Sequence, residues 1–150
     1  DVAPSRGLGD VYKRQAIHIL AFLDIYRDGD LSSKMIAASI GANASVVRNL
    51  MSELRESGFI TTRQGAVTPM LAKSPTEISL YDVYIAISID HNLLHIDPKT
   101  NPDCIVGGNI QQTLNGIYSD IETTAYDRMK SISISDVIKD ILVLQQYKTK

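Results

Sequence analysis

Apolar residues recur at helical spacing in the first third of the chain. Residues 15–26 are rich in Ile, Leu, Ala and Phe and contain few polar residues. Such a segment predicts a helix that is buried on most of its sides. A second, shorter helix is expected to begin at Ser32 or Ser33, either of which is a favourable N-cap, and to end at Ile40. Gly41 then breaks the helical pattern.

A third helix and a strand pair follow. Residues 44–57 carry one apolar stripe at helical spacing, and Asn43 before them is a favourable N-cap. After this helix the pattern becomes strand-like over 59–62, a turn signal follows at 64–65, and a returning strand is expected over 67–71. Two helices joined by a short glycine-containing turn, followed by a hairpin, predict a winged helix-turn-helix whose core the first helix completes.

The second half of the chain predicts further helices and a polar loop. A short helix is expected over 80–88, a loop over 89–103, a long helix over about 108–129 and a last helix from about Ser135. Apolar residues on the long helix follow one another at steps of four, three and four residues. They are Ile110, Leu114, Ile117 and Ile121. So narrow a stripe is typical of a coiled-coil-like seam, which packs either inside the chain or against a second copy.

These elements define a mainly α-helical fold with one small β-hairpin. Residues 14–75 are predicted to form a winged helix-turn-helix DNA-binding domain, and residues 76–150 a helical region for dimerisation and, as a further option, sensing. Residues 1–13 show no apolar periodicity, contain Pro and Gly, and do not begin with Met. We expect them to be a disordered arm or a remnant of cloning or sequence assembly.

Composition narrows the class of protein. The chain has 150 residues, of which 44% are hydrophobic and 21% charged, and no apolar run is long enough to cross a membrane. A single cysteine excludes a disulfide framework within the chain and favours a reducing, cytoplasmic location. The net charge of −2 is unevenly distributed: residues 31–75 carry five basic and two acidic groups, whereas residues 76–150 carry six basic and ten. The basic part coincides with the predicted DNA-binding domain.

Candidate DNA contacts lie on three of the predicted elements. The outward face of the third helix carries residue types that read base edges or hold phosphates. These residues are Ser45, Arg48, Asn49 and Ser52. Arg63 and Gln64 at the hairpin tip could reach the minor groove or the flanking phosphates, and Ser32, Ser33 and Lys34 open a helix whose free backbone N–H groups favour a phosphate. Each element also has a plain interpretation: a solvated polar face, an ordinary exposed hairpin, and simple N-capping.

Other chemistry has little support in the sequence. His91, His95 and Cys104 are metal-ligand residue types, but three such groups in one loop fall short of the four ligands of a structural zinc site. A Cys–His nucleophile pair would lack an orienting third group, so we expect no enzyme activity, no metal and no cofactor. His18 is surrounded by apolar residues and is interpreted as a packed, hydrogen-bonded histidine.

A family resemblance rests on several short strings taken together. They are residues 16–20 (AIHIL), 36–37 (IA), 46–48 (VVR), 54–60 (LRESGFI), 77–84 (EISLYDVY) and 101–107 (NPDCIVG). In this order and spacing, the chain resembles the Rrf-two family of bacterial winged-helix transcription regulators over about residues 14–143. The resemblance implies a homodimer that binds a palindromic operator in double-stranded DNA, usually as a repressor. It also implies base-reading positions at Ala44, Ser45, Arg48 and Asn49, a wing over 63–68, and a dimer seam on the long helix.

Two departures from the family pattern shape the prediction. Many members hold an iron–sulfur cluster with three cysteines before the long helix, and this chain has only Cys104 there, so it resembles the cluster-free branch. That branch includes members that sense metabolites through a partner protein and members with a single redox-active cysteine. The usual Gly-Gly pair of the wing is replaced by Val67-Thr68-Pro69.

The prediction is therefore a cytoplasmic, homodimeric, cluster-free transcription regulator that binds DNA and responds to a small-molecule or protein co-effector. Two alternatives remain open. One is a winged-helix protein-interaction module that has lost DNA binding. The other is a thiol-based redox sensor that acts through Cys104.

Overall fold

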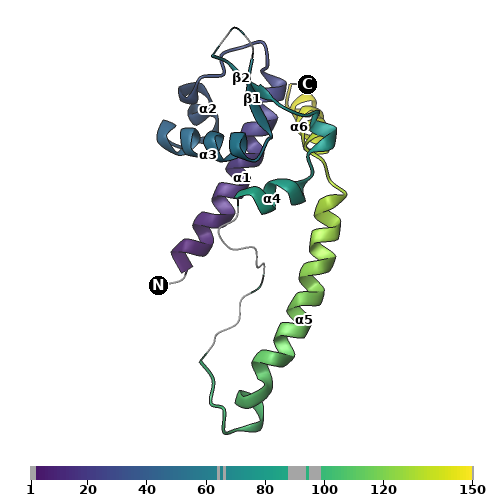
Figure 1. The fold of residues 1–150 in the computed structure, drawn as a ribbon. Helices are drawn as coiled ribbons and strands as arrows, with labels where there is room; N and C mark the ends of the chain where they lie inside the picture. Colours follow the sequence, from purple (N-terminus) through teal and green to yellow (C-terminus); the bar gives the residue numbers. More distant parts are fainter. Residues whose placement is uncertain (1–2, 64, 66, 88–93, 95–98, 150) are drawn as a thin grey trace.

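The computed structural model describes residues 3–63, 65, 67–87, 94 and 99–149 of the chain. Along these residues a helix is followed by a helix pair, a hairpin, a 3₁₀ turn and then the helices of the second half (Figure 1). The elements are α1 (Ala3–Ile25), α2 (Ser33–Ile40), α3 (Ala44–Glu56), β1 (Ile60–Thr62), β2 (Pro69–Leu71), η1 (Pro75–Glu77), α4 (Leu80–Ile87), α5 (Ile105–Lys130) and α6 (Ile134–Lys148). In this part of the chain, no helix is both long and apolar enough to cross a membrane.

One apolar core joins α1, α2 and α3 to the start of α6. Its fully buried side chains are Ile19, Leu20, Leu23, Ile36, Val47, Leu54, Ile78, Val83 and Ile134. β1 and β2 pair antiparallel beside this core, with Ile60 opposite Leu71. The predicted mainly α-helical fold with one small hairpin and a long helix in the second half is confirmed.

Local hydrogen bonds explain why α2 and α3 begin where they do. Ser32 Oγ accepts a hydrogen bond from the backbone N–H of Met35 at 3.3 Å, and Asn43 Oδ1 accepts one from Val46 at 2.9 Å. Each bond satisfies a backbone donor that has no partner inside its helix. Between the two helices Gly41 adopts a φ of 79°, a left-handed conformation that favours glycine. Ser32, Gly41 and Asn43 therefore set the start of α2, the turn and the start of α3.

α1 begins earlier than the sequence pattern predicts. It is continuous from Ala3 to Ile25, whereas the apolar spacing predicted a helix from residue 15. Tyr12 packs against the core, four residues before the buried Ala16, which continues the helical spacing of α1 toward its N-terminus. Pro4 stands near the helix start, where its missing N–H removes no intrahelical bond.

The second half of the chain is anchored to the winged-helix part at two serines. Ser79 and Ser133 form a short antiparallel bridge, flanked by backbone bonds of 2.8 Å from Leu80 to Ile132 and from Ile134 to Ile78. Ser133 also caps α6, which begins at Ile134 rather than at Ser135. α6 then packs on α1 and η1, so the chain returns to the core after α5.

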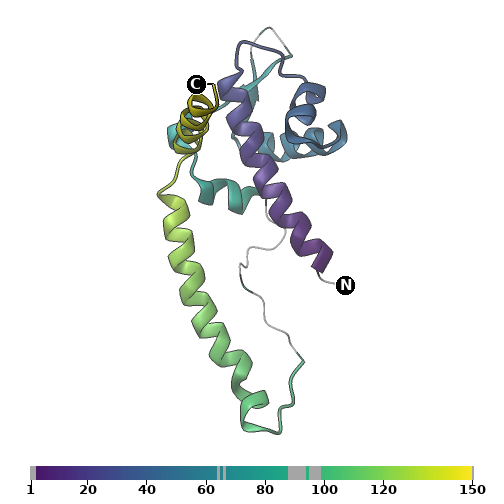
Figure 2. The same cartoon turned by 180° about the vertical axis from the view of Figure 1, so that it is seen from behind.

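α5 projects away from the rest of the molecule. Figures 1 and 2 show its C-terminal end beside α4 and α6 and its N-terminal end far from the winged-helix part. The helix begins at Ile105, three residues before the predicted start at Gly108, because Cys104 serves as its N-cap. α5 contains no buried residue, although it is the longest helix in the described part of the chain.

Candidate DNA-binding interface

The outward face of α3 holds the side chains expected to read DNA. At about 100° per residue, Ser45, Arg48 and Asn49 fall on one side of the helix, and all three are exposed. The opposite side packs into the core through Val47, Leu50, Met51 and Leu54. Arg48 Nη2 donates to Ser45 Oγ at 3.4 Å, so Ser45 helps to orient the guanidinium. These three residues are called the α3 face.

Ala44 is less exposed than the other predicted base-reading positions. The family resemblance implied a base-reading position there, but Ala44 is partly buried and packs against the core. Its side chain is a single methyl group, so it can offer DNA only a small apolar contact. The structure thus brings together three of the four predicted reading residues on one exposed face.

The start of α2 is more crowded than the sequence suggested. Lys34 is exposed there, and Ser32 is occupied as the N-cap. The backbone N–H of Ser32 also donates to Asp30 Oδ1 at 2.9 Å, and the hydrogen bonds from the Ser32 backbone and hydroxyl hold the pKa of the Asp30 carboxyl below its usual value. This carboxylate, which sequence reasoning missed, already supplies a negative charge beside the helix N-terminus. A phosphate would have to share that position with it.

The wing is a short hairpin with an exposed tip. The backbone N–H of Arg63 donates to Thr68 at 2.8 Å, and Gly65 turns the chain with a φ of 79°. The Arg63 side chain is exposed, and Val67 is 100% exposed. Gln64, the other predicted wing contact, lies outside the described residues. Pro69 lacks the N–H needed to continue the ladder, which is consistent with strands of three residues each.

Charge is distributed unevenly around these elements. Residues 31–52 contain no acidic residue, and neither do residues 57–76. The acidic groups between them, Glu53 and Glu56, lie in the last turn of α3. Figure 1 shows α2, α3 and the hairpin at the same end of the molecule, away from the free end of α5. The cations Lys34, Arg48 and Arg63 therefore lie in segments that contain no acidic residue, and the nearest acidic groups along the chain are Asp30, Glu53 and Glu56.

The predicted dimer seam on α5 faces solvent along much of its length. Ile110 and Leu114 are partly buried, Ile117 is 50% exposed and Ile121 is 48% exposed. Residues 104–119 contain no charged side chain, although most of them are exposed. Interfaces between proteins are depleted in charged side chains at their centres. An uncharged, half-exposed apolar stripe on an isolated helix has the character of a contact surface.

Aromatic rings fix the other side of α5 against α4. Tyr126 lies 5.5 Å from Tyr81 and 5.7 Å from Tyr84 between ring centroids, and its hydroxyl donates to Glu122 Oε2 at 3.1 Å. Burial and the hydrogen bond to Glu122 raise the pKa of the Tyr126 phenol. Lys13 of α1 places its Nζ 3.5 Å from the Tyr84 centroid, so the junction also reaches α1. Sequence reasoning missed this junction because it forms only when α4 and α5 meet.

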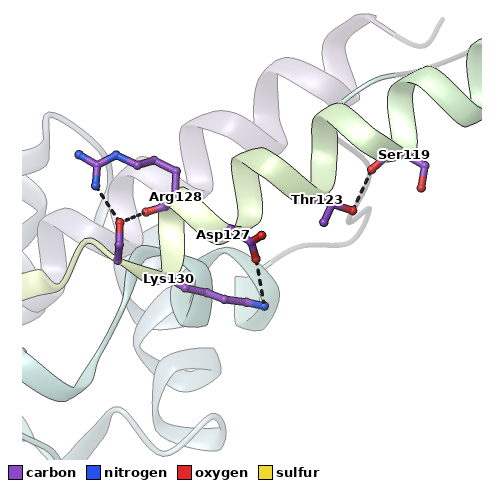
Figure 3. A network of polar contacts seen from close by, with 6 residues as sticks. Ser119, Thr123, Asp127, Arg128 and Lys130 are labelled. Carbon is purple, nitrogen blue, oxygen red and sulfur yellow. Dashed lines mark hydrogen bonds and ion pairs between the residues drawn. The ribbon is translucent and has the colours of Figure 1, made fainter.

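Polar side chains make local contacts at the C-terminal end of α5 (Figure 3). Arg128 Nη1 donates to Ser131 Oγ at 2.7 Å, and Ser131 Oγ donates to the Arg128 carbonyl at 2.6 Å. Asp127 and Lys130 form an exposed ion pair of 3.9 Å, which contributes little to stability. Thr123 Oγ1 donates to the Ser119 carbonyl one turn earlier at 2.9 Å. These contacts lie toward the end of the helix. They do not involve the side chains of the apolar stripe at Ile110, Leu114, Ile117 and Ile121.

Cys104 lies at the opposite end of α5 and is exposed. Its Sγ accepts a hydrogen bond from the backbone N–H of Gly107 at 2.9 Å and lies 3.7 Å from the Asn101 carbonyl oxygen. Thr100 Oγ1 donates to the Gly107 carbonyl at 2.7 Å. A side chain at Gly107 would collide with the Asn101 backbone, so glycine is required for this close approach. The loop presents the thiol at a fixed place on the surface.

His18 is hydrogen-bonded between α1 and α2. Its Nε2 lies 2.8 Å from Ser39 Oγ, and the prediction of a packed, hydrogen-bonded histidine is confirmed. Burial, followed by the charge of Arg14, lowers the pKa of His18 below 6.5. His91 and His95 lie outside the described residues.

Comparison with known proteins identifies the family. A family model described as an iron-dependent transcriptional regulator, Rrf2, matches residues 11–140. The chain belongs to the Rrf2 (Rrf-two) family. The resemblance stated from the sequence is thereby confirmed, and with it the class of transcription regulators.

Several relatives share most of the length of this Rrf2 protein. It is 33% identical to the HTH-type transcriptional regulator YwnA of Bacillus subtilis over 126 residues, which cover 84% of this chain and 93% of YwnA. It is also 33% identical to a protein whose crystal structure is described as that of a DNA-binding protein, with a TM-score of 0.66 and coverage of 85% and 98%. CymR, the global cysteine regulator of B. subtilis, has the same fold at 18% identity, with a TM-score of 0.60 and coverage of 85% and 91%.

The iron dependence in the Rrf2 description does not fit the donors of this chain. Iron–sulfur clusters need several thiolates, and Cys104 is the one cysteine of the sequence. Its Sγ acts as the N-cap of α5 and is exposed. Within the described residues, no group of three or more His, Cys, Asp or Glu side chains could hold a metal ion. A cluster ligated by several cysteines of one Rrf2 chain therefore cannot form here.

Proposed function

We propose that this Rrf2 regulator is a homodimer that represses transcription by binding a palindromic operator without an iron–sulfur cluster. The observation that carries the proposal is the α3 face, where Ser45, Arg48 and Asn49 lie exposed together on the second helix of the helix-turn-helix. This helix enters the major groove in such motifs, and arginine and asparagine there pair with guanine and adenine edges. The acid-free segments around the face favour approach to phosphates.

The remaining contacts position the protein on the duplex. Lys34 at the start of α2 and Arg63 beside the tip of the wing would bind phosphates on either side of the groove. These contacts carry little sequence information, but they make binding dependent on salt. The α5 stripe would join two copies, so that two α3 faces meet two half-sites of a palindrome.

A DNA titration tests this function. Purified protein would be titrated against the DNA upstream of its own gene at low and physiological salt, with random DNA as control. We expect specific binding that weakens steeply with salt, and a loss of roughly 1–3 kcal/mol of specific binding in Arg48→Ala. Arg55→Ala is the matched control, because Arg55 is an exposed arginine in the last turn of the same helix.

Two outcomes would contradict the proposal. Equal losses of DNA binding in Arg48→Ala and Arg55→Ala would show that the α3 face does not read bases. Binding would then depend only on general electrostatic attraction. No binding to either DNA at either salt would favour the alternative of a protein-interaction module on a winged-helix scaffold. The partner would then have to be found by other means.

Thiol sensing by Cys104 is a second candidate, favoured by the exposed Sγ held at the start of α5. Peroxide would oxidise this thiol to a sulfenic acid and would itself be reduced to water. Cys104→Ser keeps a side chain that can cap the helix but cannot undergo this oxidation. We expect peroxide to change the operator affinity of the wild type and not that of Cys104→Ser. An equal response of both proteins to peroxide would exclude the sensor.

A further inference from the structure

The last two turns of α6 expose apolar side chains on every side. Up to Asp140 the helix is amphipathic, with Ile134 and Ile138 buried and Asp136, Lys139 and Asp140 exposed. From residue 141 onward the exposed side chains are mostly apolar. They are Ile141, Leu142, Val143, Leu144 and Tyr147, and the exposed fraction reaches 53% for Leu144 and 73% for Tyr147. Residues 141–147 are called the α6 end.

The α6 end lies beyond the part of α6 that the family model matches. The Rrf2 match ends at residue 140, where the outward side of α6 changes from charged to apolar. Val143 and Tyr147 fall on the side of Asp136 and Asp140 at about 100° per residue. A helix that is apolar all round is normally buried, and a contiguous apolar patch marks an interaction site. The contacts that bury Ile138 do not extend to the α6 end, so its apolar side chains remain uncovered in the single chain.

Opposite charges flank the α6 end in an order that suits a second copy of the same helix. Val137, Ile141 and Leu144 follow one another at steps of four and three residues, which is coiled-coil spacing. Asp140 precedes Leu144 by four residues and Lys148 follows it by four. In an antiparallel pair centred on Leu144, Asp140 of each helix lies opposite Lys148 of the other, and Ile141 lies opposite Tyr147. Residues 141–147 contain no charge that such a pairing would bury.

We propose that the α6 end is a self-association surface, on which α6 of a second copy packs antiparallel about Leu144. A two-fold contact brings a patch against itself, so it needs a surface that is self-complementary in charge. The Asp140–Lys148 arrangement meets that requirement twice. Aromatic residues are enriched and Lys, Glu and Asp are depleted at the centres of interfaces, as they are here. A nucleic acid would find no cation between residues 141 and 147.

Sedimentation velocity on the full chain over a range of concentrations tests the surface. We expect Leu144→Asp to weaken association by at least about tenfold, because one substitution places two carboxylates at the axis. Lys139→Glu is the matched control, because Lys139 is an exposed charge on another side of α6. Measurement in an Ile117→Glu background separates this contact from the proposed α5 seam. Circular dichroism would confirm that each variant is folded.

Charge exchange gives a readout that a merely structural role of α6 would not produce. Asp140→Lys and Lys148→Asp should each weaken association by about two- to tenfold, and the double variant should restore it. In a Cys104→Ser background, Leu144→Cys should form a disulfide between copies under mild oxidation, whereas Lys139→Cys should not. Association that is indifferent to Leu144→Asp, or a charge exchange that fails to restore it, would overturn the proposal. DNA binding is measured separately, so a failure here leaves the proposed regulator untouched.

Discussion

The winged-helix part and α5 place their apolar residues in opposite environments. α1, α2 and α3 bury theirs in a shared core, as Leu54 shows with no exposed surface. α5 carries an apolar stripe of similar spacing, yet it contains no buried residue, and Ile117 remains half exposed. The winged-helix part is therefore stabilised within one chain. The stripe of α5 stays partly exposed within one chain.

The comparison also shows that an apolar stripe in the sequence can indicate packing within one chain or packing against a second chain. A stripe with helical spacing predicts that a helix has an apolar face, but it does not say which chain supplies the partner. Charge helps to decide. Exposed Arg48, Glu53 and Arg55 accompany the buried stripe of α3, whereas residues 104–119 of α5 have no charged side chain on any face. A helix that contacts only its own chain on one face can place charges on the other.

The largest expected effect is on the core of the winged-helix part. Leu54→Ala removes a side chain with 0% exposure and leaves a cavity, so the free energy of unfolding should fall by about 2–5 kcal/mol. Urea unfolding followed by circular dichroism measures this loss. The loss should be the same at low and high protein concentration, because the contacts lie within one chain. A loss that grew on dilution would contradict the assignment of this core to the monomer.

The next effect concerns α5. Ile117→Glu places a charge in the middle of the exposed stripe, and it should weaken the proposed dimer by roughly 2–4 kcal/mol, since a two-fold interface contains the substitution twice. Sedimentation equilibrium measures the change in the dimer dissociation constant. Gln112→Glu adds the same charge to an exposed position on the other side of α5 and should have little effect. Equal dissociation constants for both variants would place the seam elsewhere.

Local chemistry explains which boundaries could be predicted from the sequence. Ser32, Gly41 and Asn43 act through bonds to residues at most four positions away, so their identities suffice to predict where α2 begins and ends and where α3 begins. Cys104 also caps a helix, but cysteine is an uncommon N-cap, and α5 was expected to start later. α1 begins before the predicted start at residue 15, and Tyr12 in this additional part packs against the core.

Tertiary docking explains what the sequence could not predict in the candidate site. The α3 face was predictable because the buried stripe of α3 fixes which side chains point outward. The partial burial of Ala44 depends on how closely α3 lies on its neighbours, and no spacing rule contains that information. The junction of Tyr81, Tyr84 and Tyr126 joins residues more than forty positions apart in the chain. Such contacts follow from the way in which α4 meets α5.

A smaller effect is expected at the turn of the helix-turn-helix. Gly41→Ala should reduce the free energy of unfolding by about 1–2 kcal/mol, because a residue with a Cβ pays for the left-handed φ of 79°. A Cβ at Gly41 would meet no atom within 4 Å, so this cost is conformational and not steric. Gly29→Ala is the control, since the φ of Gly29 is not in this region. Equal unfolding midpoints for the two variants would contradict this explanation of the turn.

The smallest expected effect is a pH dependence within the winged-helix part. Because burial lowers the pKa of His18 from 6.5, folding favours the neutral ring. Its contribution to stability is complete above pH 6.5, where the ring is neutral in both states, and declines as the pH falls toward the folded-state pKa. His18→Gln cannot take up this proton, so its stability should fall less than that of the wild type between pH 7.5 and pH 5. His91 and His95 are present in both proteins and cancel.

Ser39→Ala sharpens the pH test. The variant loses the 2.8 Å contact with Nε2 but leaves His18 partly buried, so most of the pH dependence should remain if burial is the main cause. Proton NMR of the ring would report the pKa of His18 directly in both proteins. A His18 pKa that rose to 6.5 in Ser39→Ala would assign the shift to the hydrogen bond instead. An unchanged, lowered pKa would show that the neutral ring is a property of the α1–α2 packing, as expected for a part of the chain whose stability comes from its own core.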